Sequence, residues 1–316
     1  MITVAGEALL DIVVDPAGAL AAHPGGAALN VARTIARLGG DCRFLGRLSG
    51  DRLGARLRAA AVEDGVTLVA PEPVSEPTTL ALAELDERGV AEYAFYLQGT
   101  SAAQLAPRDV PAGLPGETGT LVLGGLALLM EPIASTLAGL VTKLPSDSLV
   151  VLDPNCRAGA AADPAAHRRL IDGLSERADV VKVSTGDLAM LAPGTDPRRA
   201  AHRLLDRGAR VVLVTNGAAP VEVMWRDRWL QVPVPRVPVR DTVAAGDALV
   251  GAFTLWWAGR SLGREQLGSE ELLARAVAGA VEIAALTCTR PGAEPPRIPN
   301  WQLSPAVASG LIAAAG

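Results

Sequence analysis

The sequence predicts an α/β fold, a three-layer sandwich with a mostly parallel central sheet, and two observations support this class. Short β-branched or leucine-rich segments alternate with segments of helical periodicity along most of the chain, as in successive βα units. The chain has 316 residues, of which 49% are hydrophobic, so it can bury a sizeable core. We expect one domain over residues 1–316 whose sheet is covered by helices on both faces.

The expected elements follow one another in a regular order. Strands are predicted at residues 2–6, 42–48, 121–125, 148–153, 179–184 and 211–215, where short apolar runs end in polar residues or glycine. Helices are predicted at residues 27–38, 52–63, 131–143, 164–176 and 196–207. The Pro-rich segment 231–239 is expected to run as an extended edge, because proline cannot donate to a sheet ladder.

Two segments interrupt this alternation. Residues 12–23 and 78–99 contain no long helical pattern, and the second contains two strand-like runs joined around Asp86–Gly89, as in a hairpin. We therefore expect lid strands inserted at about 11–24 and 76–101. Such strands could cover a ligand or pair two subunits in a homodimer.

Composition excludes several classes of function. The formal net charge is −5 with acidic and basic residues interspersed, so neither nucleic acid nor a membrane surface is an expected partner. No apolar run approaches the roughly 20 residues needed to span a bilayer, and Met1 leads directly into a strand-like segment, so we expect a cytoplasmic protein. The three cysteines and three histidines lack the spacing of a zinc site and suit a reducing compartment.

Several common motifs are absent from the sequence. No two glycines are separated by a single residue, which excludes a GxGxxG turn, and the P-loop, GxSxG and HExxH patterns do not occur. A nucleotide would therefore have to be held by another kind of turn.

The segment Asp241-Thr242-Val243-Ala244-Ala245-Gly246-Asp247 is a candidate for that turn. It leads into an apolar helix, whose free N–H groups and positive end could hold a phosphate beside Asp247. Alternatively, Asp241 or Thr242 could cap the helix, and Asp247 could merely complement its dipole. We expect an ordinary negative φ at Ala244, because a left-handed residue with a Cβ is strained.

Two further segments carry polar groups near predicted strand or helix ends. Gly25 and Gly26 open a helix, and Asn30 lies one turn later among apolar neighbours, where an unpaired buried amide would cost about 1–3 kcal/mol. The segment Asp153-Pro154-Asn155-Cys156-Arg157 follows a buried strand, where ligands bind in open α/β sheets. Tight-turn geometry explains the glycines equally well, and Asp-Pro-Asn is also common turn chemistry.

Together, GGAALNVARTIARLGG, LDPNCR, VKVSTGD, VTNG and DTVAAGDALVGAF resemble, in order and spacing, the motifs of the ribokinase-like carbohydrate kinases, the phosphofructokinase-B superfamily. GEALLDIV and EYAFYLQGTSA look most like bacterial fructokinases. The resemblance implies an α/β sandwich with a β lid, and phosphoryl transfer from ATP with Mg²⁺ to a sugar hydroxyl. It implies that Asp247 is the general base and that backbone N–H groups at Ala244, Ala245 and Gly246 form an anion hole.

The same resemblance implies further site residues. Those expected to bind the sugar are Asp11, Gly25, Gly26, Asn30, Phe95 and Arg157. Those expected to bind ATP are Ser184, Asp187, Thr215 and Gly217, with Asp187 contacting the metal through water, and Asp241 and Val243 would hold a monovalent cation such as K⁺. Asp11 could instead be a solvated acid at a strand end, and Arg157 an ordinary ion-pair partner.

Departures from the family pattern bear on activity and substrate. Ser184 and Asp187 stand where the family often has Asn and Glu, and Ala244 stands where it has Gly. A positive φ at Ala244 would favour a kinase that has degenerated and lost phosphoryl transfer. Leu97 occupies the place of an Arg that meets the carboxylate in 2-keto-3-deoxygluconate kinases, so a neutral hexose, fructose, is the expected substrate. The alternatives are a 2-keto-3-deoxygluconate kinase, a nucleoside kinase, or a sugar-binding protein that has lost phosphoryl transfer.

Overall fold

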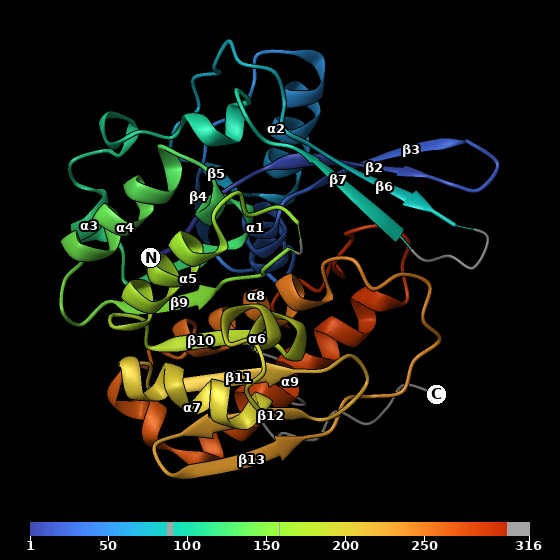
Figure 1. Ribbon diagram of the computed structural model, residues 1–316. Helices are drawn as coiled ribbons and strands as arrows, with labels where there is room; N and C mark the ends of the chain where they lie inside the picture. Colours follow the sequence, from blue (N-terminus) through green and yellow to red (C-terminus); the bar gives the residue numbers. More distant parts are fainter. Residues whose placement is uncertain (87–90, 158, 302–316) are drawn as a thin grey trace.

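A nine-stranded sheet forms the centre of the protein, as the computed structural model shows for residues 1–86, 91–157 and 159–301 (Figure 1). Its strands, in spatial order, are β13 (Arg228–Val232), β12 (Val221–Trp225), β11 (Val211–Thr215), β10 (Val180–Ser184), β9 (Leu149–Asp153), β8 (Thr120–Gly124), β1 (Ile2–Ala5), β4 (Cys42–Leu45) and β5 (Thr67–Leu68). Neighbours from β11 to β5 are parallel, and only β12 pairs antiparallel, with β11 and β13. The mostly parallel sheet predicted from the sequence is confirmed.

Helices cover both faces of this sheet. One apolar cluster contains residues of α1 (Ala27–Arg37), α2 (Arg52–Asp64), α8 (Ala245–Ala258) and α9 (Glu270–Cys288). The other contains residues of α3 (Leu114–Glu117), α4 (Ile133–Lys143), α5 (Pro164–Ser175), α6 (Thr185–Leu191) and α7 (Pro197–Arg207). Strand residues alternate between the two clusters, so that Val122 of β8 faces the first and its neighbours Leu121 and Leu123 face the second. The fold is therefore a three-layer α/β sandwich.

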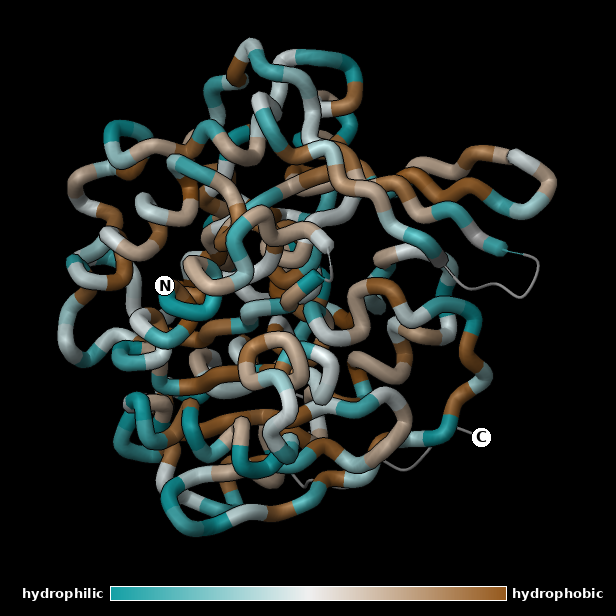
Figure 2. The backbone as a smooth tube through the Cα atoms, in the orientation of Figure 1, coloured by the Kyte–Doolittle hydropathy of each residue, from teal (hydrophilic) through white to brown (hydrophobic). Residues whose placement is uncertain are grey.

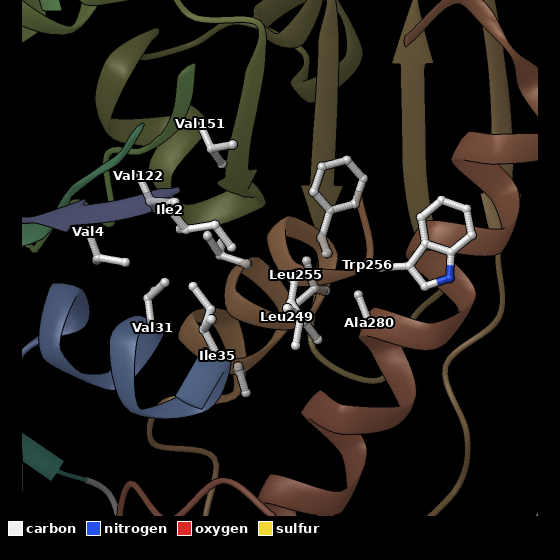
Figure 3. Packing of buried hydrophobic residues seen from close by; sticks show 14 of the residues in the cluster. Ile2, Val4, Val31, Ile35, Val122, Val151, Leu249, Leu255, Trp256 and Ala280 are labelled. Carbon is white, nitrogen blue, oxygen red and sulfur yellow. The ribbon is translucent and has the colours of Figure 1, made fainter. Parts of the chain in front are cut away.

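The first apolar cluster places α1 and α8 next to each other against the sheet. In Figure 3, Val31 and Ile35 of α1 lie beside Leu249 and Leu255 of α8, close to strand residues such as Val122. These side chains are at most 4% exposed, and each contributes roughly 1.5–3 kcal/mol through burial. Because both helices are held in the same layer, their N-termini can contribute to the same site.

Local signals explain where at least four of the nine described α-helices begin. Asp51, Asp163, Asp196 and Ser269 each accept a backbone N–H in the first turn of the helix that follows, and Pro164 and Pro197 start α5 and α7. In contrast, α8 has Ala244 at its N-cap and no side-chain cap. Four short 3₁₀ helices complete the described helices: Ser101–Gln104, Pro107–Asp109, Gly125–Leu129 and Glu265–Gly268.

The two segments that interrupt the alternation form a second, four-stranded sheet. Its strands, in order, are β3 (Leu20–Gly25), β2 (Leu9–Val14), β6 (Leu80–Leu85) and β7 (Ala91–Tyr96), and only β2 and β6 are parallel. This small sheet extends from the body at the upper right of Figure 1, and Figure 2 shows hydrophobic stretches along it. The expected hairpin is present as β6 and β7, but most of its turn, residues 87–90, lies outside the described residues.

Three observations concern membranes, cysteines and metals. Within the described ranges, no helix combines the length and apolarity that crossing a membrane requires. Cys42, Cys156 and Cys288 are free thiols. In the same part of the chain, no group of three or more His, Cys, Asp or Glu side chains is arranged to hold a metal ion.

Candidate active site

A cavity of about 670 Å³ lies between the small sheet and the N-termini of α1 and α8. Leu9, Ala81 and Phe95 line it from the small sheet, whereas Ala27 and Asp247 line it from the two helices. Most of the predicted sugar and anion residues share this cavity: Asp11, Gly26, Asn30, Phe95, Arg157, Ala244, Gly246 and Asp247 all line it. The fold thus brings together residues from both ends of the chain.

The carboxylate of Asp247 is held by two amide side chains. Asn30 Nδ2 donates to Oδ2 at 2.9 Å, and Asn155 Nδ2 donates to Oδ1 at 3.3 Å. The residue is 6% exposed, and burial raises its pKa, while the hydrogen bond from Asn30 and the charges of Lys182 and Arg157 lower it. Its orientation is therefore fixed, and its proton affinity is above that of an ordinary aspartate.

Asn30 is also placed to bind a ligand. Because a carboxylate only accepts hydrogen bonds, the contact with Asp247 identifies which end of the amide is Nδ2. Among the described residues, the buried Oδ1 of Asn30 has no partner, although the side chain borders the cavity. An unpaired buried acceptor costs about 1–3 kcal/mol, which a bound hydroxyl donor would offset.

The expected negative φ at Ala244 is wrong. Ala244 has φ 62° and ψ 8°, in the left-handed region. The reason is that Ala244 precedes α8 rather than belonging to it: Ala245 N donates to Thr242 O at 3.3 Å and closes a turn whose second central residue is Ala244. In a type II turn that position needs φ > 0, which explains why the family pattern has glycine there.

A positive φ was also the sign expected of a kinase that has degenerated, but the turn itself keeps its free donors. Ala245 N–H is directed to Thr242, so its contribution to an anion site is reduced. Among the described residues, the N–H groups of Ala244, Gly246 and Asp247 have no acceptor, and all three residues line the cavity. The uncapped N-terminus of α8 can therefore still hold an anion.

Replacing Ala244 with Gly should stabilise the protein. A left-handed alanine costs roughly 1–2 kcal/mol, and the extra freedom of glycine in the unfolded chain offsets part of that, so we expect a net gain of about 0.5–1 kcal/mol. Urea unfolding measures this gain in the free energy of unfolding. The kcat of the variant should stay within about 3-fold of the wild-type value, because glycine keeps the N–H groups of the turn in place. As a control, Ala55→Gly in the exposed face of α2 should destabilise by about 1 kcal/mol. A loss of stability in Ala244→Gly would contradict the strained turn.

Asp11 and Gly25 lie against each other across strands β2 and β3. A Cβ on Gly25 would lie 1.9 Å from Asp11 Oδ2, so only glycine leaves room for this carboxylate. Burial, followed by the charge of Asp247, raises the pKa of Asp11 to about 7, whereas Arg157 lowers it. Gly25 therefore supports the site by leaving space for Asp11, and it does not line the cavity itself. Gly26 does line the cavity, and its φ of 98° favours glycine at this position.

Glu7 is a site residue that the sequence reasoning missed. Its carboxylate accepts the N–H of Ala27 at 2.8 Å and that of Ala127 at 3.0 Å, so it caps α1 from the loop after β1. It is 1% exposed, and burial raises its pKa to about 7. The segment GEALLD contained the signal, because an acid within an apolar run after a strand is difficult to bury without partners.

One face of the β6–β7 hairpin meets the cavity. Ala81 and Ala83 of β6 pair with Phe95 and Tyr93 of β7, and all four residues line it. The two rings stack with centroids 5.9 Å apart. The sequence left open which face would meet a ligand, and the structure shows Tyr93 and Phe95 bordering the cavity, with Tyr96 exposed on the opposite face.

The four predicted ATP residues gather at the ends of two neighbouring strands. Ser184 of β10 pairs with Thr215 of β11, and Gly217 follows with φ 54°. Asp187 forms a capping box with Ser184, and its Oδ1 accepts the N–H of Cys156 at 2.7 Å. This last contact connects the strand ends to the loop that carries Arg157, which borders the main cavity.

The predicted metal residues are already engaged with protein groups. Asp187 Oδ2 accepts the N–H and hydroxyl of Ser184 at 2.6 and 2.7 Å, and the residue is 3% exposed, so only a water-mediated metal contact fits it. Asp241 accepts Val243 N at 2.9 Å and Gly292 N at 2.8 Å. Asp241 thus holds the 241–243 turn against residues 290–293. Because its carboxylate already accepts these two N–H groups, backbone carbonyls would have to supply most of the ligands of a monovalent cation here.

The comparisons with known proteins agree with this geometry. Residues 2–301 match the family model described as pfkB family carbohydrate kinase, so the chain belongs to this family of carbohydrate kinases. A fructokinase of Rhizobium leguminosarum bv. trifolii is 32% identical over 255 residues, which cover 78% of this chain and 76% of the relative.

Two solved structures have the same fold. The fructokinase of Xylella fastidiosa with bound ATP has a TM-score of 0.85 and 28% identity, with 98% of each chain covered. The fructokinase of Vibrio cholerae O395 with fructose, ADP and calcium bound has a TM-score of 0.83 and 26% identity, again with 98% of each chain covered. The resemblance stated from the sequence motifs is confirmed.

Proposed function

We propose that this carbohydrate kinase transfers the γ-phosphoryl group of ATP to a hydroxyl of fructose. The observation that carries the proposal is the carboxylate of Asp247, held by Asn30 and Asn155 in a cavity bordered by the uncapped N-terminus of α8. A base and an array of backbone donors at one point are what phosphoryl transfer to a hydroxyl requires. The fructokinases of R. leguminosarum and V. cholerae support fructose as the acceptor.

Asp247 would accept the proton of the attacking hydroxyl. Burial raises the pKa of Asp247 above that of an ordinary aspartate, which makes its carboxylate a stronger base toward the proton of an alcohol. The N–H groups of Ala244 and Gly246 would bind oxygens of the transferring group, and Arg157 would add positive charge beside them. ATP would supply the phosphoryl group, and residues of this chain would take the proton, bind the transferring oxygens and position the sugar.

A neutral sugar fits the charges of the cavity better than an acidic one. Its lining has four carboxyl groups, those of Glu7, Asp11, Asp241 and Asp247, against two guanidinium groups, so a substrate carboxylate would meet an excess of acids. Leu97, at the position of the arginine in 2-keto-3-deoxygluconate kinases, packs into the second apolar cluster instead. Asp11 and the free Oδ1 of Asn30 would accept hydrogen bonds from sugar hydroxyls, and Phe95 would pack on the sugar.

Metal ions and assembly extend this proposal. Mg²⁺ would arrive with the nucleotide and neutralise its charge, with Asp187 contacting it through water, and K⁺ would be held by carbonyls near Asp241 and Val243.

Leu20 and Tyr96 on the small sheet are 72% and 56% exposed, which supports a homodimer formed through that sheet. The free cysteines support a cytoplasmic location.

A coupled assay with ATP and Mg²⁺ across fructose, ribose, 2-keto-3-deoxygluconate and adenosine tests the proposed function. We expect the highest kcat/KM with fructose, by at least about 10-fold, since the loss of hydroxyl contacts costs more than 1 kcal/mol each. A preference for adenosine or for the acid would identify one of the alternative kinases. Fructose binding by calorimetry without turnover on any acceptor would show that this chain has lost phosphoryl transfer.

A further inference from the structure

A buried ion pair lies behind the turn that opens α8. Lys182 is the third residue of β10, and its Nζ lies 3.0 Å from Oδ2 of Asp153 at the end of the neighbouring strand β9. The two side chains are only 5% and 7% exposed. Neither residue is in the cavity lining, and the phosphoryl-transfer scheme above does not use them.

The ammonium group touches the anion turn itself. A Cβ added to Gly246 would lie 2.8 Å from Lys182 Nζ and 3.5 Å from Cε, so the backbone of Gly246 rests on the end of the lysine side chain. The chain has only one other lysine, Lys143, and otherwise uses arginine as its basic residue. A compact ammonium fits this narrow space, whereas a planar guanidinium needs more room.

The charge of Lys182 acts on Asp247. Burial lowers the pKa of Lys182, but the charge of Asp153, followed by those of Asp187 and Asp247, more than reverses this effect, so the lysine stays protonated. Reciprocally, the charge of Lys182 lowers the pKa of Asp247, against the effect of burial. The ammonium therefore favours the ionised form of the proposed base.

Stability alone does not account for such a pair. A buried ion pair pays a desolvation cost that often equals its Coulomb attraction, and an apolar pair of similar volume is frequently as stable. The lysine adds a positive charge next to Gly246. This charge lies beside the turn that carries the free N–H groups of Ala244, Gly246 and Asp247.

We propose that Lys182 is a positioning residue, whose ammonium, held by Asp153 behind Gly246, keeps Asp247 ionised and strengthens the positive potential at the N-terminus of α8. The proposal rests on the proposed function of Asp247 as the base. The groups that act on Asp247 come from several elements: Asn30 of α1, Asn155 and Arg157 after β9, Glu7 before β2, Asp11 of β2, Asp153 of β9 and Lys182 of β10.

Lys182→Met tests the proposal, together with the double variant Lys182→Met/Asp153→Leu. The single variant leaves Asp153 buried without its partner, whereas the double variant restores a neutral, apolar pair. If the lysine acts through its charge, both variants should lose about 10- to 100-fold in kcat with the KM for fructose within about 3-fold, and the acid limb of the kcat/KM profile should move to higher pH. Lys143→Met, on the exposed end of α4, is the matched control and should match the wild type.

Recovery of wild-type kcat in the double variant would overturn the proposal, because it would show that only the unpaired Asp153 had been harmful. Thermal unfolding of each variant establishes that it is folded. A carbon-13 NMR titration of the aspartate carboxyl groups reads the pKa of Asp247 without any substrate. We expect it to rise in the folded double variant, and an unchanged pKa would also overturn the proposal. Since the titration needs no turnover, it remains decisive even if the wild type phosphorylates none of the sugars.

Discussion

Asp247→Asn should reduce kcat by at least about 100-fold while leaving fructose and ATP binding within a few-fold of the wild type. The carboxylate is held by the side-chain amides of Asn30 and Asn155 and still borders the cavity, so it can take a proton from a bound hydroxyl. Loss of a positioned base typically costs 10²–10⁴ in rate. Steady-state kinetics and calorimetric titration with fructose measure the two effects separately.

Two further variants make this result interpretable. In Asp247→Asn, the new amide nitrogen would face Asn30 or Asn155, both donors, so Asp247→Ala should be measured beside it. Asp227→Asn, in the exposed turn between β12 and β13, is the control and should leave kcat unchanged. Near-normal turnover in both Asp247 variants would remove this residue from the mechanism.

Asp11→Asn should weaken fructose binding and, in the absence of sugar, stabilise the protein at alkaline pH. The KM for fructose should rise about 10- to 100-fold, because a charged acceptor contributes about 1.5–3 kcal/mol to a hydrogen bond. The stabilising effect follows from the pKa of Asp11, which burial raises from the ordinary 3.8 to about 7. Function and stability would then impose opposite requirements on one side chain.

The sign of the pH dependence is determined by proton binding. Between pH 3.8 and about 7 the folded protein binds a proton at Asp11 that the unfolded chain has lost, so the free energy of unfolding falls as pH rises through this range. Asparagine lacks this dependence. Urea unfolding should therefore show that Asp11→Asn has a slightly larger free energy of unfolding than the wild type at pH 5. At pH 8 the difference should be on the order of 2 kcal/mol. Asp227→Asn should show no such difference, and destabilisation of Asp11→Asn at pH 8 would contradict the buried charge.

The sequence predicted those parts of the fold that depend on local pattern. Apolar runs of strand length alternate with helical periodicity, and this alternation is sufficient to predict a mostly parallel sheet with helices on both faces. Carboxyl ends of parallel strands lie at one edge, so the residues after β9, β10 and β11 could be expected to be neighbours. The motif in LDPNCR follows this rule, whereas those in DTVAAGD and PGGAALN precede α8 and α1 and reach the same cavity through the packing of the two helices.

Other features of the site could not be predicted because they depend on contacts between distant residues. Asn30 and Asp247 are 217 positions apart, and no pattern near either residue identifies the other as its partner. Glu7 and Lys182 lie in apolar strand or loop segments, where the sequence shows a charge but not the group that neutralises it.

By itself, the sequence determined the class of fold, the positions of the glycine turns and the carboxylates available for chemistry, since these follow from residue type and periodicity. The left-handed conformation of Ala244 follows from the local turn closed by Thr242 and Ala245, which the sequence analysis misjudged by treating Ala244 as part of the helix. Only the tertiary structure decided which N–H groups stay free and which carboxylates share one buried space. Those outcomes depend on how α8 packs against α1 and the sheet, and long-range packing is not encoded in any single segment.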